Sequence, residues 1–144
     1  MPVPETSASN ALAYQAIRRL VNNFYTRVRA DRVLGAFFLQ EITSHAAWDQ
    51  HLDTMTEFWA SLLLGTRTYR GQTMQAHQRL GEIPEHAFER WHELFDESVN
   101  TVLADNDIEA LNPRRIKHLA RKAGRSVFLR TRDNGPRQPK GQAV

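Results

Sequence analysis

Four polar ring side chains, far apart in the sequence, could together hold and control a metal-containing cofactor. His77 ends a short polar stretch between two segments of helical period, and His51 lies on the apolar stripe of the first of these. Tyr25 lies on an earlier stripe and Trp91 on a later one. If these segments close around one apolar cavity, an imidazole can ligate a haem iron from one side. The phenol and the indole can then control a small ligand on the other side.

Taken one at a time, His77 and His51 are each better explained as structural histidines. The structural interpretation suits the other histidines better still; these are His45, His86, His92 and His118. His86 and His92 lie in a charged segment, away from its line of apolar residues. The haem hypothesis therefore depends on whether the surrounding elements bring the four rings together.

Apolar residues recur at helical spacing in four parts of the chain. The spacing predicts helices over residues 10–30, 47–64 and 84–104, and a last helix from residue 113. In the second of these, His51 shares its stripe with Met55 and Phe58, so it faces the predicted core rather than solvent. No segment alternates with period two, and the predicted fold class is all-α.

Residues that cap or break helices divide these segments. Asp31 is predicted to cap a short, inward-packed turn over residues 32–38, followed by a loop over residues 39–46. Gly65 is expected to end the second helix, and Pro84 to begin the third. These signals imply four or five principal helices around a single core.

Length and composition indicate one domain with two unstructured ends. The chain has 144 residues, of which 41% are hydrophobic and 24% charged, as in an ordinary globular domain. We expect a disordered segment over residues 1–9, a helical domain over residues 10–131 and a disordered basic tail over residues 132–144.

Several classes of function are excluded. There is no cysteine, which removes disulfides, thiolate metal sites and cysteine nucleophiles. No Gly-rich phosphate loop and no supported Ser-His-Asp pattern is present, so we predict no catalytic residues from motifs. The first residues lack the pattern of a signal peptide, and no apolar run could span a bilayer, so we expect a cytoplasmic protein without membrane insertion.

Charge is distributed unevenly along the chain. Residues 1–112 contain 9 Lys/Arg and 15 Asp/Glu, whereas residues 113–144 contain 10 Lys/Arg and a single acid. A solvated helix face followed by a flexible tail is the simpler explanation. The alternative is a cofactor-free helical interaction module that docks an acidic partner through its basic C-terminal region. A weaker third hypothesis is nucleic-acid binding through residues 114–140, although we expect no DNA partner.

Four separated motifs resemble the group III truncated haemoglobins, which are 2-on-2 globins. The motifs are Phe24-Tyr25-(x)2-Val28-(x)2-Asp31-(x)2-Leu34-Gly35-(x)2-Phe38, Trp48-Asp49-(x)-His51-Leu52-(x)2-Met55-(x)2-Phe58-Trp59, Tyr69-(x)-Gly71-(x)2-Met74-(x)2-His77-(x)2-Leu80 and Phe88-(x)-Arg90-Trp91-(x)2-Leu94-Phe95. They occur in the family's order and cover about residues 12–104. The chain also has no Gly-Gly pair, as is usual in group III.

This resemblance implies a globin-like, shortened 2-on-2 helical sandwich around haem b (iron protoporphyrin IX). By the resemblance, His77 matches the proximal metal ligand and His51 the distal gate. Tyr25 and Trp91 match the distal hydrogen-bond donors, and Phe38 matches the phenylalanine that packs on the porphyrin. Met55 and Phe58 complete the cofactor-binding set that we predict.

The function implied is binding of O₂, NO and CO at a histidine-ligated iron. Two distal donors imply slow O₂ release, which favours NO-detoxifying or peroxidase-like redox activity over O₂ transport. An unidentified reductase would then be a partner, and we expect a monomer. His51 is left with two roles, either gating the cavity or binding the iron itself.

Overall fold

The fold consists of helices. The computed structural model describes residues 4–66 and 83–134, and these contain no strand. The elements are α1 (Pro4–Ala30), α2 (Arg32–Glu41), α3 (His45–Leu64), α5 (Glu85–Leu103), the 3₁₀ helix η1 (Glu109–Leu111) and α6 (Pro113–Asn134). The predicted all-α class is confirmed. No helix in the described ranges combines the length and the apolar character needed to cross a membrane.

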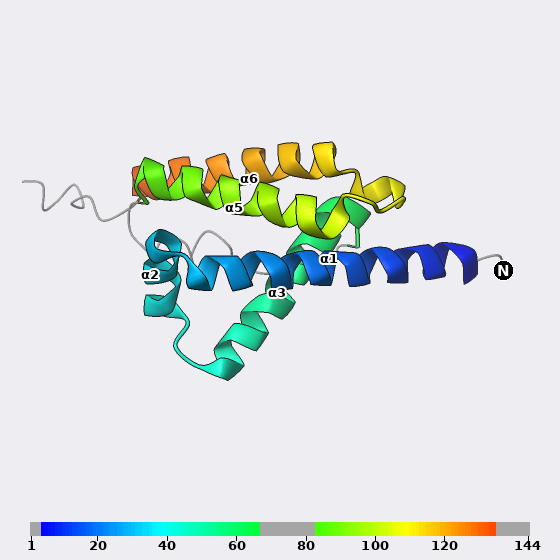
Figure 1. Cartoon of the computed structure of the whole chain (residues 1–144), viewed down its shortest axis with the longest axis horizontal. Helices are drawn as coiled ribbons and strands as arrows, with labels where there is room; N and C mark the ends of the chain where they lie inside the picture. The colour runs from blue at the N-terminus through cyan, green and yellow to red at the C-terminus, as the bar shows by residue number, and fades with distance from the viewer. Residues whose placement is uncertain (1–3, 67–82, 135–144) are drawn as a thin grey trace, which may run out of the picture.

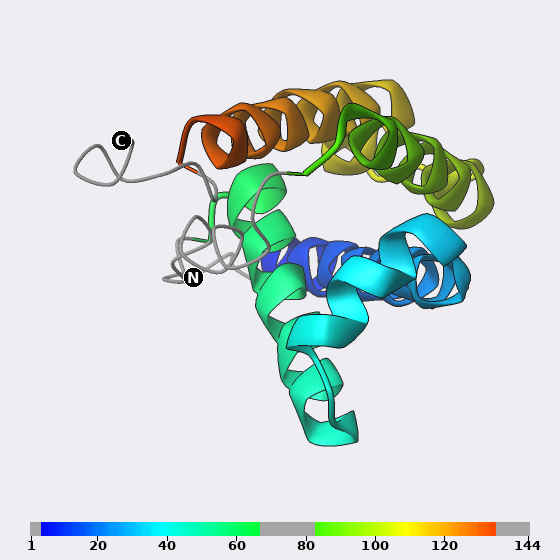
Figure 2. The ribbon, with the colours of Figure 1, turned by 90° about the vertical axis from the view of Figure 1, so that its left-hand side faces the viewer.

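Two pairs of long helices, α1 with α3 and α5 with α6, form the body of the described structure (Figure 1). α5 and α6 pack side by side along one edge, and α1 packs against both α5 and α3. The short α2 turns the chain from α1 into α3, so that α3 crosses α1 at a steep angle (Figure 2). This arrangement of α1 and α3 beneath α5 and α6 is the 2-on-2 sandwich that the sequence predicted.

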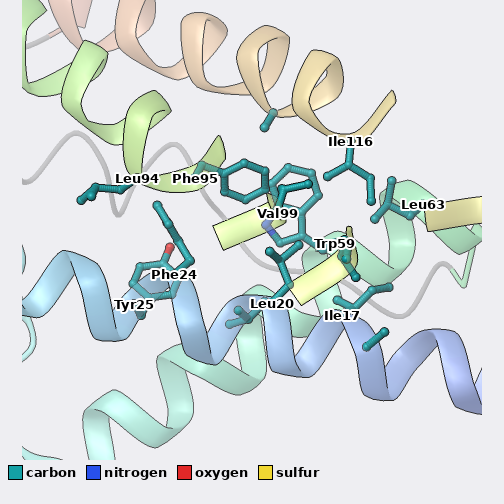
Figure 3. Packing of buried hydrophobic residues seen from close by; sticks show 14 of the residues in the cluster. Ile17, Leu20, Phe24, Tyr25, Trp59, Leu63, Leu94, Phe95, Val99 and Ile116 are labelled. Carbon is teal, nitrogen blue, oxygen red and sulfur yellow. The ribbon is translucent and has the colours of Figure 1, made fainter. Parts of the chain in front are cut away.

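The core lies where α1, α3 and α5 meet (Figure 3). Phe24 of α1 is in edge contact with Phe95 of α5 at 5.2 Å between ring centroids, and Trp59 of α3 stacks on the same Phe95 at 5.2 Å. Ile17 and Leu20 have no exposed surface. Burying a large apolar side chain contributes about 1.5–3 kcal/mol, so these stripes supply much of the driving force for the fold.

Local signals in the sequence fix several helix ends. The Asp31 carboxylate accepts hydrogen bonds from the backbone N–H groups of Val33 and Leu34, and α2 begins directly after it. Gly65 has a φ of 70°, a left-handed conformation that favours glycine, and it ends α3. Both predictions are confirmed.

Other predicted boundaries were wrong. α1 begins at Pro4 instead of residue 10, because proline is tolerated in a first helical turn and the residues that follow permit helix. α2 continues through Glu41, which leaves only residues 42–44 as a loop where residues 39–46 were expected. α6 runs through Asn134, so residues 132–134 are helical rather than part of a disordered tail.

Candidate cofactor-binding site

One cavity opens between the two helix pairs, and α1, α2, α3, α5 and α6 contribute to its wall. It encloses about 690 Å³ of empty space, including the part open to solvent, which lies within the usual range for ligand pockets. The predicted residues that line it are Tyr25, Phe38, His51, Met55, Phe58 and Trp91. The structure thus brings together every described member of the predicted cofactor-binding set. His77 lies outside the described residues.

Tyr25 and His51 form the polar part of this wall. Their ring centroids are 4.7 Å apart with the rings nearly perpendicular, and Tyr25 is only 5% exposed. Burial raises the pKa of the Tyr25 phenol above its ordinary value of 10.0. The hydroxyl therefore keeps its proton at neutral pH and remains able to donate a hydrogen bond.

Aromatic rings hold the His51 imidazole from several directions. In addition to Tyr25, Phe38 lies 6.0 Å and Trp48 5.8 Å from it, measured between ring centroids. The guanidinium of Arg29 lies 4.4 Å from the Trp48 ring centroid on its outer side. These contacts orient the imidazole, which lines the cavity.

Trp91 enters the wall from α5. Its indole stacks on Phe95 at 5.5 Å with an interplanar angle of 13°, and it meets the ring of Phe24 edge-on at 5.5 Å. Both neighbours belong to the buried core, so the indole has little freedom to move. An indole N–H can only donate, which makes Trp91 the second candidate donor of the cavity.

Gly124 of α6 provides the space in which Trp91 lies. A Cβ at position 124 would be 2.9 Å from Cζ3 of Trp91 and 3.2 Å from Cε1 of Phe88. The wall therefore keeps a smooth apolar face at this point, as a flat macrocycle requires. Together with the apolar lining and the few polar ring atoms, this cradle fits a haem.

Some residues of this region were missed by the sequence analysis. The additional lining residues are Trp59, Ile83, Phe88, Ala123, Gly124, Val127 and Phe128. A glycine in the middle of an apolar helical pattern is a signal of close packing, and it could have identified Gly124. The aromatic stripes could have identified Phe88 and Phe128, whereas nothing in the sequence singles out Ile83.

His92 differs from its predicted setting. It is 9% exposed, with its ring against Phe88 at 4.4 Å and against Trp91 at 5.2 Å. Burial lowers its pKa, and the nearby Arg121 and Arg125 lower it further, against an opposing effect of Asp96. His92 is thus buried against aromatic rings of α5, with Arg121 and Arg125 of α6 nearby, rather than on a charged outer face.

Comparisons with known proteins identify relatives of this chain. The sequence profile of the bacterial-like globins matches residues 11–124. The chain is 40% identical over 89 residues to the group 3 truncated haemoglobin ctb of Campylobacter jejuni, covering 61% of this chain and 70% of that protein. The crystal structure of the group III truncated haemoglobin from Campylobacter jejuni superposes with a TM-score of 0.65 at 31% identity, covering 83% of this chain and 88% of that one.

The fold and the apolar cavity are those of a haem-binding globin, a class that takes small gaseous ligands. Within that class, this chain belongs to the bacterial-like globins, and specifically to their group III truncated haemoglobins. The resemblance found in the four sequence motifs is confirmed.

Proposed function

We propose that this globin holds haem b through His77 and takes O₂, NO or CO on the side of the cavity that carries Tyr25, His51 and Trp91. The observation that carries the proposal is the convergence of the predicted residues. They come from α1, α2, α3 and α5, yet all the described ones line one cavity. Such convergence is not required for a helical bundle whose aromatic residues only fill a core.

Bound haem would supply the iron at which a diatomic ligand is held. The chain would supply the surroundings. Burial raises the pKa of the Tyr25 hydroxyl, so this group stays protonated and can donate a hydrogen bond. Trp91 can donate its indole N–H, and stacking on Phe95 holds the indole in place. Phe38, Met55 and Phe58 exclude water, which strengthens hydrogen bonds inside the cavity.

Two donors favour retention of a ligand over delivery. A hydrogen bond to a charged group contributes about 1.5–3 kcal/mol, so two such bonds would slow O₂ release by several orders of magnitude. A protein of this kind serves poorly as a carrier. We therefore favour NO detoxification or peroxidase-like turnover, in which the same two side chains would stabilise negative charge on a ligand that is being reduced.

We assign His51 the role of a gate rather than that of a resting iron ligand. Its ring lines the cavity and lies in edge contact with Tyr25 and Trp48, so a ligand that enters on this side would pass the imidazole. His51→Ala should accelerate CO association and leave the resting coordination unchanged. A six-coordinate spectrum that disappears in this variant would instead make His51 a ligand of the iron.

Absorption spectra of the as-isolated, reduced and CO-bound protein test the whole proposal. We expect an intense Soret band, CO-sensitive after reduction, whose axial ligation is lost in His77→Gly and restored by added imidazole. His118→Gly, on the exposed side of α6, is the matched control and should retain the wild-type spectrum. If haem is not taken up, the cofactor-free interaction module replaces this proposal. Sedimentation velocity tests the expected monomer.

A further inference from the structure

The outer side of α6 carries a continuous row of basic residues. We call it the basic stripe, and it consists of Arg114, His118, Arg121, Lys122 and Arg125, all exposed. Their spacing of i, i+4, i+7, i+8 and i+11 places them on one face of the helix. No acidic residue lies between Pro113 and Arg132, so nothing on α6 itself neutralises this face.

The opposite side of the same helix belongs to the cavity. Ala123, Gly124 and Val127 line it directly. A helix with its side chains is about 10–12 Å across, so the basic stripe and the cavity are separated by about one helix diameter. Arg125 is closer still, because its guanidinium lies 5.4 Å above the ring of Phe88, which is itself part of the cavity wall.

Few of these charges are used within the molecule. Arg121 pairs with Asp96 at 3.7 Å, whereas Arg114 and Lys122 make no ion pair with any residue in the described ranges. In Figure 2, α6 lies at the edge of the ribbon, and α5 covers one of its sides. The basic stripe is therefore available to a partner.

We propose that the basic stripe is the docking surface for an acidic, flavin-containing electron-donor protein. The inference rests on the proposed function, because redox turnover needs a supply of electrons. One electron would pass from the donor's reduced flavin to the ferric haem across about one helix diameter, and no bond would form or break. Opposite charges would steer the encounter and make its rate depend on salt.

Neighbouring residues favour a protein partner over a nucleic acid. The groove beside the stripe is lined by Glu89 and Glu93 of α5 as well as by Arg121 and Arg125. A protein surface can place basic side chains opposite these carboxylates and acidic ones opposite the stripe, whereas a phosphate backbone carries negative charge throughout. Leu129, 47% exposed and one turn beyond Arg125, adds an apolar contact of the kind found inside protein interfaces.

The test uses flavodoxin, an acidic one-electron donor, as the probe. Stopped-flow absorption measures reduction of the ferric globin by reduced flavodoxin, and calorimetry measures binding of oxidised flavodoxin. We expect both to weaken as salt is raised from 20 to 200 mM. Arg121→Gln combined with Lys122→Gln should slow reduction by about tenfold and weaken binding similarly.

A matched control removes the same charge elsewhere. Arg19 and Arg32 are exposed on α1 and α2, and Arg19→Gln combined with Arg32→Gln should leave reduction and binding within twofold of wild type. Reduction by dithionite, which needs no docking, reports whether each variant keeps an intact haem site. Equal losses in both double variants, or no dependence on salt, would overturn the proposal.

Tighter binding of a DNA or RNA duplex than of flavodoxin at the same ionic strength would also overturn it. The calorimetric measurement does not require haem. Absence of haem uptake would therefore defeat the proposed function while the docking surface was still tested by binding alone.

Discussion

The indole of Trp91 occupies the space that a side chain at position 124 would need, since a Cβ on Gly124 would lie 2.9 Å from its Cζ3 atom. The ring cannot retreat freely, because it stacks on Phe95 and touches Phe24. The position of a candidate hydrogen-bond donor in α5 is thus determined by the absence of a side chain in α6.

Gly124→Ala should therefore displace the indole and loosen the cofactor. Replacing a mid-helix glycine by alanine ordinarily stabilises a helix by about 1 kcal/mol, so a loss here can be assigned to the contact with Trp91. We expect haem transfer to apomyoglobin to become about tenfold faster, a change of about 1.4 kcal/mol.

Ser126→Ala serves as the matched control, because Ser126 is exposed on the same helix and lines no part of the cavity. It should transfer haem at the wild-type rate. A Gly124→Ala protein that keeps both its haem and its tryptophan fluorescence would show that the wall adapts without cost.

Asp31 links the start of α2 to α5, and its removal should destabilise both. Its carboxylate caps α2 and accepts a hydrogen bond from Nε of Arg90 at 2.7 Å. Loss of the cap costs about 1 kcal/mol, and loss of a partly buried charged hydrogen bond about as much again. Asp31→Ala should therefore lower the free energy of unfolding in urea at pH 7 by about 2 kcal/mol.

The contribution of Asp31 should also depend on pH. Burial alone would raise its pKa, but the N–H of Leu34, the guanidinium of Arg90 and the N–H of Val33 outweigh burial and lower it. Because its pKa is lowered in the folded state, the ionised Asp31 carboxylate stabilises the fold when the pH is above the unfolded-state pKa of about 3.8. This stabilisation is lost as the pH falls below that pKa. The difference in stability between the wild type and Asp31→Ala should thus be smaller at pH 3 than at pH 7. Asp53→Ala, in an exposed pair with Arg18, should show little difference at either pH.

Much of this architecture is encoded locally, which explains why it could be predicted. The stripe that carries His51, Met55 and Phe58 has a single apolar side, so the face of α3 that meets the core follows from spacing alone. Asp31 and Gly65 likewise act on backbone groups within a few residues of themselves. The predicted cavity residues came from the resemblance to the group III truncated haemoglobins, and those on helical stripes, such as Tyr25 and Trp91, also follow from spacing.

Non-local packing explains what could not be predicted. Glu89 and Glu93 make the surroundings of His92 look solvent-exposed, yet the ring is buried near Arg121 and Arg125 of α6, and nothing near position 92 specifies where α6 will lie. The same holds for Ile83, which enters the cavity wall from outside any stripe. The extension of α1 to Pro4 depends on polar residues whose propensity for helix and loop is similar.

His92 should make the fold sensitive to mild acid. Its pKa is lowered by burial and by Arg121, so the unfolded chain takes up a proton more readily than the folded one. His92 therefore has no pH-dependent cost above its ordinary pKa of 6.5, and the free energy of unfolding should fall as the pH drops below that pKa.

Urea unfolding at pH 7 and pH 5 measures this effect. His92→Gln should reduce the difference between the two values, and His118→Gln, at an exposed position on α6, should retain it. An unchanged difference in His92→Gln would mean that another group titrates in this range.

The two donors of the cavity should control the release of O₂. Tyr25→Phe removes the buried hydroxyl and keeps the ring that contacts His51, and Trp91→Phe removes the N–H while keeping an apolar ring on Phe95. A charged hydrogen bond of about 1.5–3 kcal/mol corresponds to about a tenfold to hundredfold faster dissociation for each replacement.

Tyr14→Phe is the control, because the Tyr14 phenol donates to Glu57 outside the cavity and should leave the rate unchanged. The raised pKa of Tyr25 adds a second expectation: its hydroxyl should stay protonated, and the wild-type rate constant, followed by stopped-flow spectroscopy, should remain flat between pH 6 and pH 9. Rates that match wild type in both cavity variants would contradict the assignment of Tyr25 and Trp91 as ligand donors.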